Sequence, residues 1–138
     1  MKSLLLSFCL FVIPLSAFAA SNDSTLPPGL WKVRIFAPGL TPAMANDEQT
    51  YQICYSEADA KNHVNPVLPK AEAKGCQADF MDLGDLAFDA SCPDSDHRLR
   101  ISQAGEDSWR GTYRYVAKDS NLMLEPAVEL TRIAPTCQ

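Results

Sequence analysis

Two cysteines, Cys76 and Cys92, stand at equal distances from Gly84 in the stretch CQADFMDLGDLAFDASC. If Gly84 is the centre of a hairpin turn, Cys76 lies opposite Cys92 and Phe80 lies opposite Phe88 on the same side of an antiparallel pair. Directly opposed residues in such a pair have Cα atoms roughly 4.5 to 5.5 Å apart, a distance that a disulfide bridges. The spacing therefore predicts a β-hairpin closed by a Cys76–Cys92 disulfide.

The first 19 residues have the pattern of a secretory signal peptide. Lys2 precedes an apolar run over residues 4–15, and the small residues Ala17 and Ala19 follow it. The run is short for a transmembrane helix, which needs about 20 apolar residues, and no later segment approaches that length. We expect cleavage after Ala19, an exported protein without a transmembrane segment, and a single β domain over residues 20–138.

Four cysteines remain after this cleavage, because Cys9 lies in the signal peptide. An even number in an exported chain predicts two disulfides. Four cysteines allow three connectivities; with Cys76 joined to Cys92, the second bridge would join Cys54 to Cys137. A zinc site is the weaker interpretation, because no two of these cysteines have the close spacing that zinc sites favour.

The mature chain is acidic. Loss of Lys2 leaves 11 basic and 17 acidic side chains, so the formal charge changes from −5 to −6. This balance disfavours binding to nucleic acid or to an anionic membrane surface.

Apolar and polar residues alternate with a period of two in several segments bounded by turn residues, a pattern typical of antiparallel strands with one face in water. The expected strands are residues 30–36, 50–55, 76–82, 86–92, 97–103, 108–116 and 122–132. Only residues 56–62 look helical, with Ser56 and Asp59 placed to form a capping box. We predict an all-β fold, an antiparallel meander of about seven strands with one short helix, which forms a curved sheet or partly open barrel stapled by disulfides.

One set of registers keeps the apolar faces of the successive hairpins in phase, whereas a slip of one residue would turn every side chain to the other face. The opposed pairs that it predicts are Cys92 with His97, Phe88 with Ile101, Asp89 with Arg100, Gln103 with Trp109, Arg98 with Arg114, and Tyr115 with Leu122.

A group of basic side chains is expected on the outward face of the sheet. Its members are Arg98, Arg100, Arg110 and Arg114, with Lys32 and Arg34 on the first strand. Such a stripe is a candidate site for an anion or an acidic partner. The alternative, which we favour, is a solvated face with cross-strand charge pairs, because Asp79 and Asp89 oppose each other there and would repel unless Arg100 or Arg98 lay nearby.

Signals for metal binding and catalysis are weak. Asp94, Asp96 and His97 cluster at a turn, but a calcium loop needs more oxygen ligands and zinc further imidazoles. The chain has no G-x-S-x-G elbow, no paired-histidine motif and no phosphate-binding glycine loop. We therefore assign no catalytic residue, metal or cofactor.

The aromatic side chains of the predicted interior allow two interpretations. They are Trp31, Trp109, Tyr113, Tyr115, Phe80 and Phe88. A curved sheet or small barrel can enclose an apolar ligand. The alternative, which we favour for so short a chain, is a filled core.

Several landmarks occur in an order that resembles the bacterial domain of unknown function 3617. They are PPGLWKV, ICYSEADA, the Cys76–Cys92 hairpin, RGTYRY and TRIAPTCQ, and together they span about residues 27–137. The resemblance implies a small exported protein of Gram-negative bacteria, located in the periplasm; the family has no established activity, so there are no catalytic residues to carry over.

These observations favour a noncatalytic binding or accessory protein of the envelope. Its partner would be a small apolar ligand held inside the curved sheet or an envelope protein bound at a loop or edge. The alternative is a small secreted enzyme inhibitor that uses a protruding loop such as residues 37–49. A hydrolase with an unrecognised site is the least favoured interpretation.

Overall fold

The computed structural model describes residues 25–37 and 48–138, so the predicted signal peptide lies outside the described residues. They form eight strands and one helix, in the order β1 (Gly29–Phe36), β2 (Gln49–Tyr55), α1 (Glu57–Lys61), β3 (Gln77–Asp82), β4 (Leu86–Ser91), β5 (Ser95–Gly105), β6 (Ser108–Ala117), β7 (Met123–Leu124) and β8 (Ala127–Ala134).

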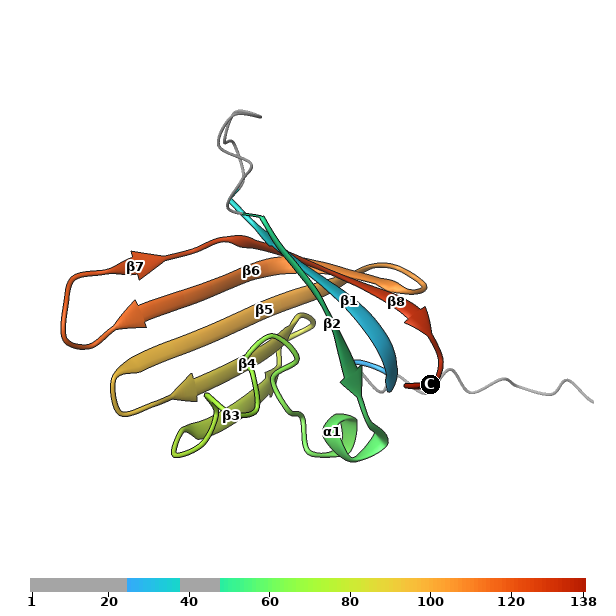
Figure 1. Cartoon of the computed structure of the whole chain (residues 1–138), viewed down its shortest axis with the longest axis horizontal. Helices are drawn as coiled ribbons and strands as arrows, with labels where there is room; N and C mark the ends of the chain where they lie inside the picture. The colour runs from blue at the N-terminus through green and yellow to red at the C-terminus, as the bar shows by residue number, and fades with distance from the viewer. Residues whose placement is uncertain (1–24, 38–47) are drawn as a thin grey trace, which may run out of the picture.

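The strands form one open antiparallel sheet in the order β2-β1-β8-β6-β5-β4-β3, and the short β7 pairs with β6. From β3 to β6 each strand pairs with the next along the chain, as a meander requires. The β1–β2 hairpin joins this meander through β8, so the first strand pairs with the last. Figure 1 shows the strong curvature of the sheet and the position of β1 and β2 across β5 and β6. The predicted all-β, disulfide-stapled fold is confirmed.

Both disulfides join the predicted partners. The Cys54–Cys137 bridge has an S–S distance of 2.04 Å and joins β2 to the chain after β8. The Cys76–Cys92 bridge has Cα atoms 4.1 Å apart and closes the β3–β4 hairpin. Gly84 occupies the turn of this hairpin with a φ of 88°, a conformation that favours glycine. The two disulfides therefore hold opposite edges of the sheet.

The register between β4 and β5 differs from the prediction by two residues. Asp89 lies opposite Arg98, not Arg100, and Phe88 lies opposite Leu99. The reason is the tightness of the turn: the amide of Cys92 donates to the carbonyl of Ser95 at 2.8 Å, so the chain reverses within two residues. Because the shift is even, each side chain stays on its predicted face.

The predicted β5–β6 register is confirmed, but the strand expected at residues 122–132 is divided. Leu99 lies opposite Tyr113, as predicted. Tyr115 lies opposite Leu124 instead of Leu122. Pro126 separates β7 from β8 because it has no amide hydrogen for a ladder; its carbonyl accepts from the Tyr113 amide at 3.0 Å.

Helix α1 has the predicted capping box. The Ser56 hydroxyl accepts from the Asp59 amide at 3.1 Å, and the Asp59 carboxylate accepts from the Ser56 amide at 3.0 Å. The chain after α1 lies against the concave face of the sheet (Figure 1), where the Tyr51 hydroxyl donates to the carbonyl of Val67 at 3.0 Å. Val67 and Leu68 are buried there, so this segment covers part of the concave face.

The core lies between the concave face and this covering segment. Its largest fully buried side chains are Trp31, Phe88, Leu26, Leu86, Leu99, Ile101, Leu130, Val33 and Val128. Of the aromatic residues predicted for the interior, Trp31, Trp109 and Phe88 are buried, whereas Phe80, Tyr113 and Tyr115 are half-buried. No helix in the described part of the chain is long and apolar enough to cross a membrane.

The close approach of β5 to β6 at Gly111 predicts a strong effect of an added methyl group. A Cβ at this position would overlap the carbonyl oxygen of Arg100 and lie 2.9 Å from the Cα of Ile101. Gly111→Ala should therefore lower the free energy of unfolding by about 2 kcal/mol or more, as measured by urea denaturation. The control is Gly105→Ala, whose Cβ would lie 3.6 Å from that of Ser108. Equal midpoints for the two variants would contradict this account.

Candidate functional site

A groove of about 700 Å³ opens where β7 and β8 separate. It is lined by Ile35, Phe36, Ala37, Gln49, Tyr113, Tyr115, Leu124, Glu125 and Pro126. These residues come from the end of β1, the start of β2, the second half of β6 and the β7–β8 junction. Its volume lies in the range of about 300 to 1,000 Å³ that is usual for small-molecule sites.

The local sequence explains why β7 and β8 separate at this point. The chain leaves its ladder with β6 at Glu125 and Pro126, because proline cannot donate to the sheet. The side chain of Leu124 is left 52% exposed, next to Met123 at 53% and Leu122 at 48%. Of these three exposed residues Leu124 lines the groove, and an exposed apolar side chain beside a concave surface points to an interaction site.

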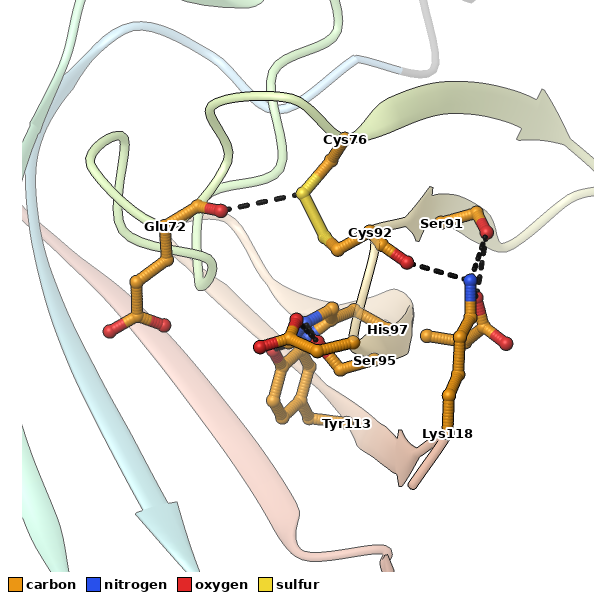
Figure 2. Close-up of a disulfide and its surroundings, with 10 residues drawn as sticks. Glu72, Cys76, Ser91, Cys92, Ser95, His97, Tyr113 and Lys118 are labelled. Carbon is orange, nitrogen blue, oxygen red and sulfur yellow. Dashed lines mark hydrogen bonds and ion pairs between the residues drawn. A yellow bond between two sulfur atoms is a disulfide. The ribbon is translucent and has the colours of Figure 1, made fainter. Parts of the chain in front are cut away.

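A buried polar network lies behind the two tyrosines of the groove. The Ser95 hydroxyl is 2.9 Å from Nε2 of His97, and Nδ1 of His97 is 2.5 Å from the Tyr113 hydroxyl. The ring of Tyr115 packs against the edge of His97 with centroids 5.3 Å apart. Figure 2 shows this network beside the Cys76–Cys92 disulfide, with Glu72 on the neighbouring loop. The tyrosines thus have a fixed position.

The carboxylate at the end of the network sets the direction of its hydrogen bonds. Asp94 can only accept, so the Ser95 hydroxyl donates to it at 3.2 Å. Ser95 then accepts from Nε2–H of His97, and Nδ1 accepts from the hydroxyl of Tyr113. Burial lowers the pKa of His97, an effect that the charges of Glu72, Asp94 and Asp96 partly oppose. A neutral His97 protonated on Nε2 satisfies every member of the network.

The same geometry makes Ser95 a poor nucleophile. Ser95 and His97 are only 6% and 8% exposed, so a substrate carbonyl cannot reach the hydroxyl in this conformation. In a nucleophilic pair the serine hydroxyl donates to the histidine, whereas here it donates to Asp94. The other ring nitrogen of His97, Nδ1, faces the hydroxyl of Tyr113. A hydroxyl at this position does not stabilise an imidazolium as the carboxylate of a catalytic triad does. The serine and histidine are therefore better explained as structural groups.

The four predicted arginines lie together on the convex face of β5 and β6. Arg98 is opposite Arg114. Arg98 forms two hydrogen bonds to Asp89, at 2.8 and 2.9 Å, and Arg110 lies 3.6 Å from Glu129. Within the described ranges, Arg100 and Arg114 have no ion pair. The stripe is therefore partly neutralised by cross-strand partners, as in the interpretation that the sequence favoured.

The arginine next to the opposed Asp79 and Asp89 is Arg98, one of the two that the sequence offered, bound to Asp89. The two aspartates are directly opposed, as predicted. The two-residue shift places Arg98, not Arg100, opposite Asp89. Next to them, a hollow of about 360 Å³ is lined by both Arg98 and Arg114 and by Asp89 and Asp96, so its charges balance and it does not select an anion.

The turn with Asp94 and Asp96 has no arrangement for a metal. The carboxylate of Asp96 accepts from Ser91 at 2.7 Å and lies 3.2 Å from the ammonium group of Lys118. Within residues 25–37 and 48–138, no three histidine, cysteine or acidic side chains gather closely enough to hold a metal ion. Most of the loop proposed for an inhibitor, residues 38–47 of 37–49, lies outside the described residues.

Sequence patterns identified only part of the groove. They placed Tyr113 and Tyr115 on the inner face, but they did not single out Phe36, Leu124 or Glu125, which the β1–β8 pairing and the β7–β8 junction bring there. The sequence signal that could have located the groove is Pro126, which interrupts an apparently continuous strand.

Comparisons of the chain with protein-family models, with curated proteins and with solved structures found no match. The resemblance to the bacterial domain of unknown function 3617 stays a prediction.

The lowered pKa of His97 predicts a loss of stability in mild acid. Below its ordinary pKa of 6.5 the unfolded chain takes up a proton on this histidine more readily than the folded chain. The free energy of unfolding should therefore fall as the pH decreases from about 7.5 to 5.5, before the carboxylates titrate. Urea denaturation of His97→Asn should show a weaker fall, whereas His63→Asn should retain it. An identical pH dependence in wild type and His97→Asn would contradict the assignment.

The corrected register predicts that Arg98 couples with Asp89. A double-mutant cycle of Arg98→Ala and Asp89→Asn should give a coupling free energy of up to about 1 kcal/mol at low salt, because the pair is partly exposed. The coupling should shrink in about 1 M NaCl. The matched cycle with Arg100→Ala should give a coupling free energy near zero. A larger coupling of Asp89 with Arg100 than with Arg98 would disprove the register.

Proposed function

We propose that this protein is an exported, periplasmic, noncatalytic binding protein that holds a small apolar molecule in the groove between β1, β6 and the β7–β8 junction. The observation that carries the proposal is the aromatic and aliphatic lining of this groove, with exposed Leu124 at its margin. Sites for small molecules are mostly apolar, with a few fixed polar groups. Gln49 and Glu125, both exposed, add polar side chains to this lining.

Export is supported by the chemistry of the cysteines. Both bridges are formed, and disulfides persist in oxidising compartments such as the bacterial periplasm. The predicted signal peptide at residues 1–19 agrees with this assignment.

A noncatalytic role is supported by the burial of the Ser95–His97 pair. The network holds the two lining residues Tyr113 and Tyr115 in place from behind, so the binding surface is ordered before a ligand arrives. Prepared surfaces reduce the entropic cost of binding. We interpret the network as the support of the site.

The proposal predicts that a polar substitution at the margin of the groove weakens binding of an apolar probe. Leu124→Gln should raise the Kd of Nile red about fivefold, because about 1 kcal/mol of apolar contact is lost. The matched control is Leu83→Gln, since Leu83 is 64% exposed in the β3–β4 turn and does not line the groove. Fluorescence titration measures both. Equal losses, or no saturable binding, would contradict the proposed function.

A further inference from the structure

The charge of the groove narrows the class of ligand. Among the described residues that line it, Glu125 is the only charged one, and none is a lysine, arginine or histidine. In the described part of the chain, Glu125 takes part in no ion pair. An anionic ligand would therefore bring its charge next to an uncompensated carboxylate, whereas a cation would neutralise it.

The aromatic lining favours the same sign of charge. Tyr113, Tyr115 and Phe36 contribute rings, whose faces carry partial negative charge and attract organic cations. The ring of Phe36 is already occupied by the guanidinium of Arg34, 4.2 Å from its centroid, so Tyr113 and Tyr115 are the rings left for a ligand cation. The rings and Glu125 thus act on a ligand in the same direction.

The support of the groove occupies the hydroxyl of Tyr113. The hydroxyl of Tyr113 is 2.5 Å from Nδ1 of His97 and donates to it. It is therefore unavailable to an anionic or carbonyl oxygen of a ligand. The neutral His97 behind the ring adds no positive charge that would repel a cation.

On these grounds we propose that the groove binds an organic cation with an apolar body, with the charged centre at Glu125 and the apolar groups against the rings of Tyr113 and Tyr115. This inference rests on the proposed function, since it assigns a ligand class to the same groove.

The test compares two probes of the same shape and opposite charge. Tetraphenylphosphonium and tetraphenylborate differ chiefly in sign, so the ratio of their Kd values, measured by calorimetry at low salt, reports charge selection. Tetraphenylphosphonium should bind at least tenfold more tightly. Glu125→Gln should weaken its binding about fivefold. Leu124→Gln should weaken the binding of both probes.

The net negative charge of the chain alone would favour any cation, so a matched acidic residue is needed as the control. Glu106→Gln removes the same charge in the β5–β6 turn, away from the groove lining, and should leave the Kd ratio unchanged. Equal effects of Glu106→Gln and Glu125→Gln would overturn the assignment of the cation to Glu125.

The failure of this inference is distinguishable from failure of the proposed function. If both probes bind with equal Kd values and Leu124→Gln weakens both, the groove is a binding site without charge selection, and only the inference is wrong. If Leu124→Gln changes neither Kd, the groove is not the site and both proposals are wrong.

Discussion

Pairing between the first and the last strand of the sheet determines the rest of the architecture. β1 lies between β2 and β8, in continuous register with β8 from Trp31 to Phe36 and with a register shift between Leu30 and Trp31. This pairing attaches the β1–β2 hairpin to the meander of β3 to β6 and places Trp31 and Val33 in the common core. The Cys54–Cys137 bridge joins the two neighbours of β1 and thereby limits their separation in the unfolded chain. Without this contact the two ends of the chain would form separate units, and neither would bury its apolar face.

The groove follows from the same pairing together with one local break. β8 pairs with β1 along its length, but Pro126 ends its ladder with β6, and β7 continues that ladder for only two residues. The end of β1 therefore faces Tyr113 and Tyr115 across the groove. The buried network of Ser95 and His97 fixes these tyrosines from behind. A backbone interruption and a polar support thus produce a concave apolar surface in a chain of modest size.

Local signals in the sequence predicted much of this fold. The features that the sequence did not predict depend on turn length or on pairing between strands that are far apart in the chain. The symmetry about Gly84 fixed the β3–β4 register, and Ser56 with Asp59 predicted the helix cap, because each depends on neighbours a few residues away. The β4–β5 turn could close over two residues or four, and both keep the alternation of faces, so the pattern alone could not choose between them. Because of this ambiguity, the predicted register paired Asp89 with Arg100, whereas the structure pairs it with Arg98. The groove was missed for a related reason: its walls meet only through the β1–β8 pairing, which leaves no periodic signal.

The most direct test of the binding role is native mass spectrometry of the full-length protein after export to a bacterial periplasm and purification without denaturation. The account predicts a mature chain with two disulfides and an additional mass of a few hundred daltons that is lost on denaturation. The Leu124→Gln variant should carry less of this mass than the Leu83→Gln control. A bare chain in every preparation, or an adduct retained equally by both variants, would contradict the assignment of the groove as a ligand site.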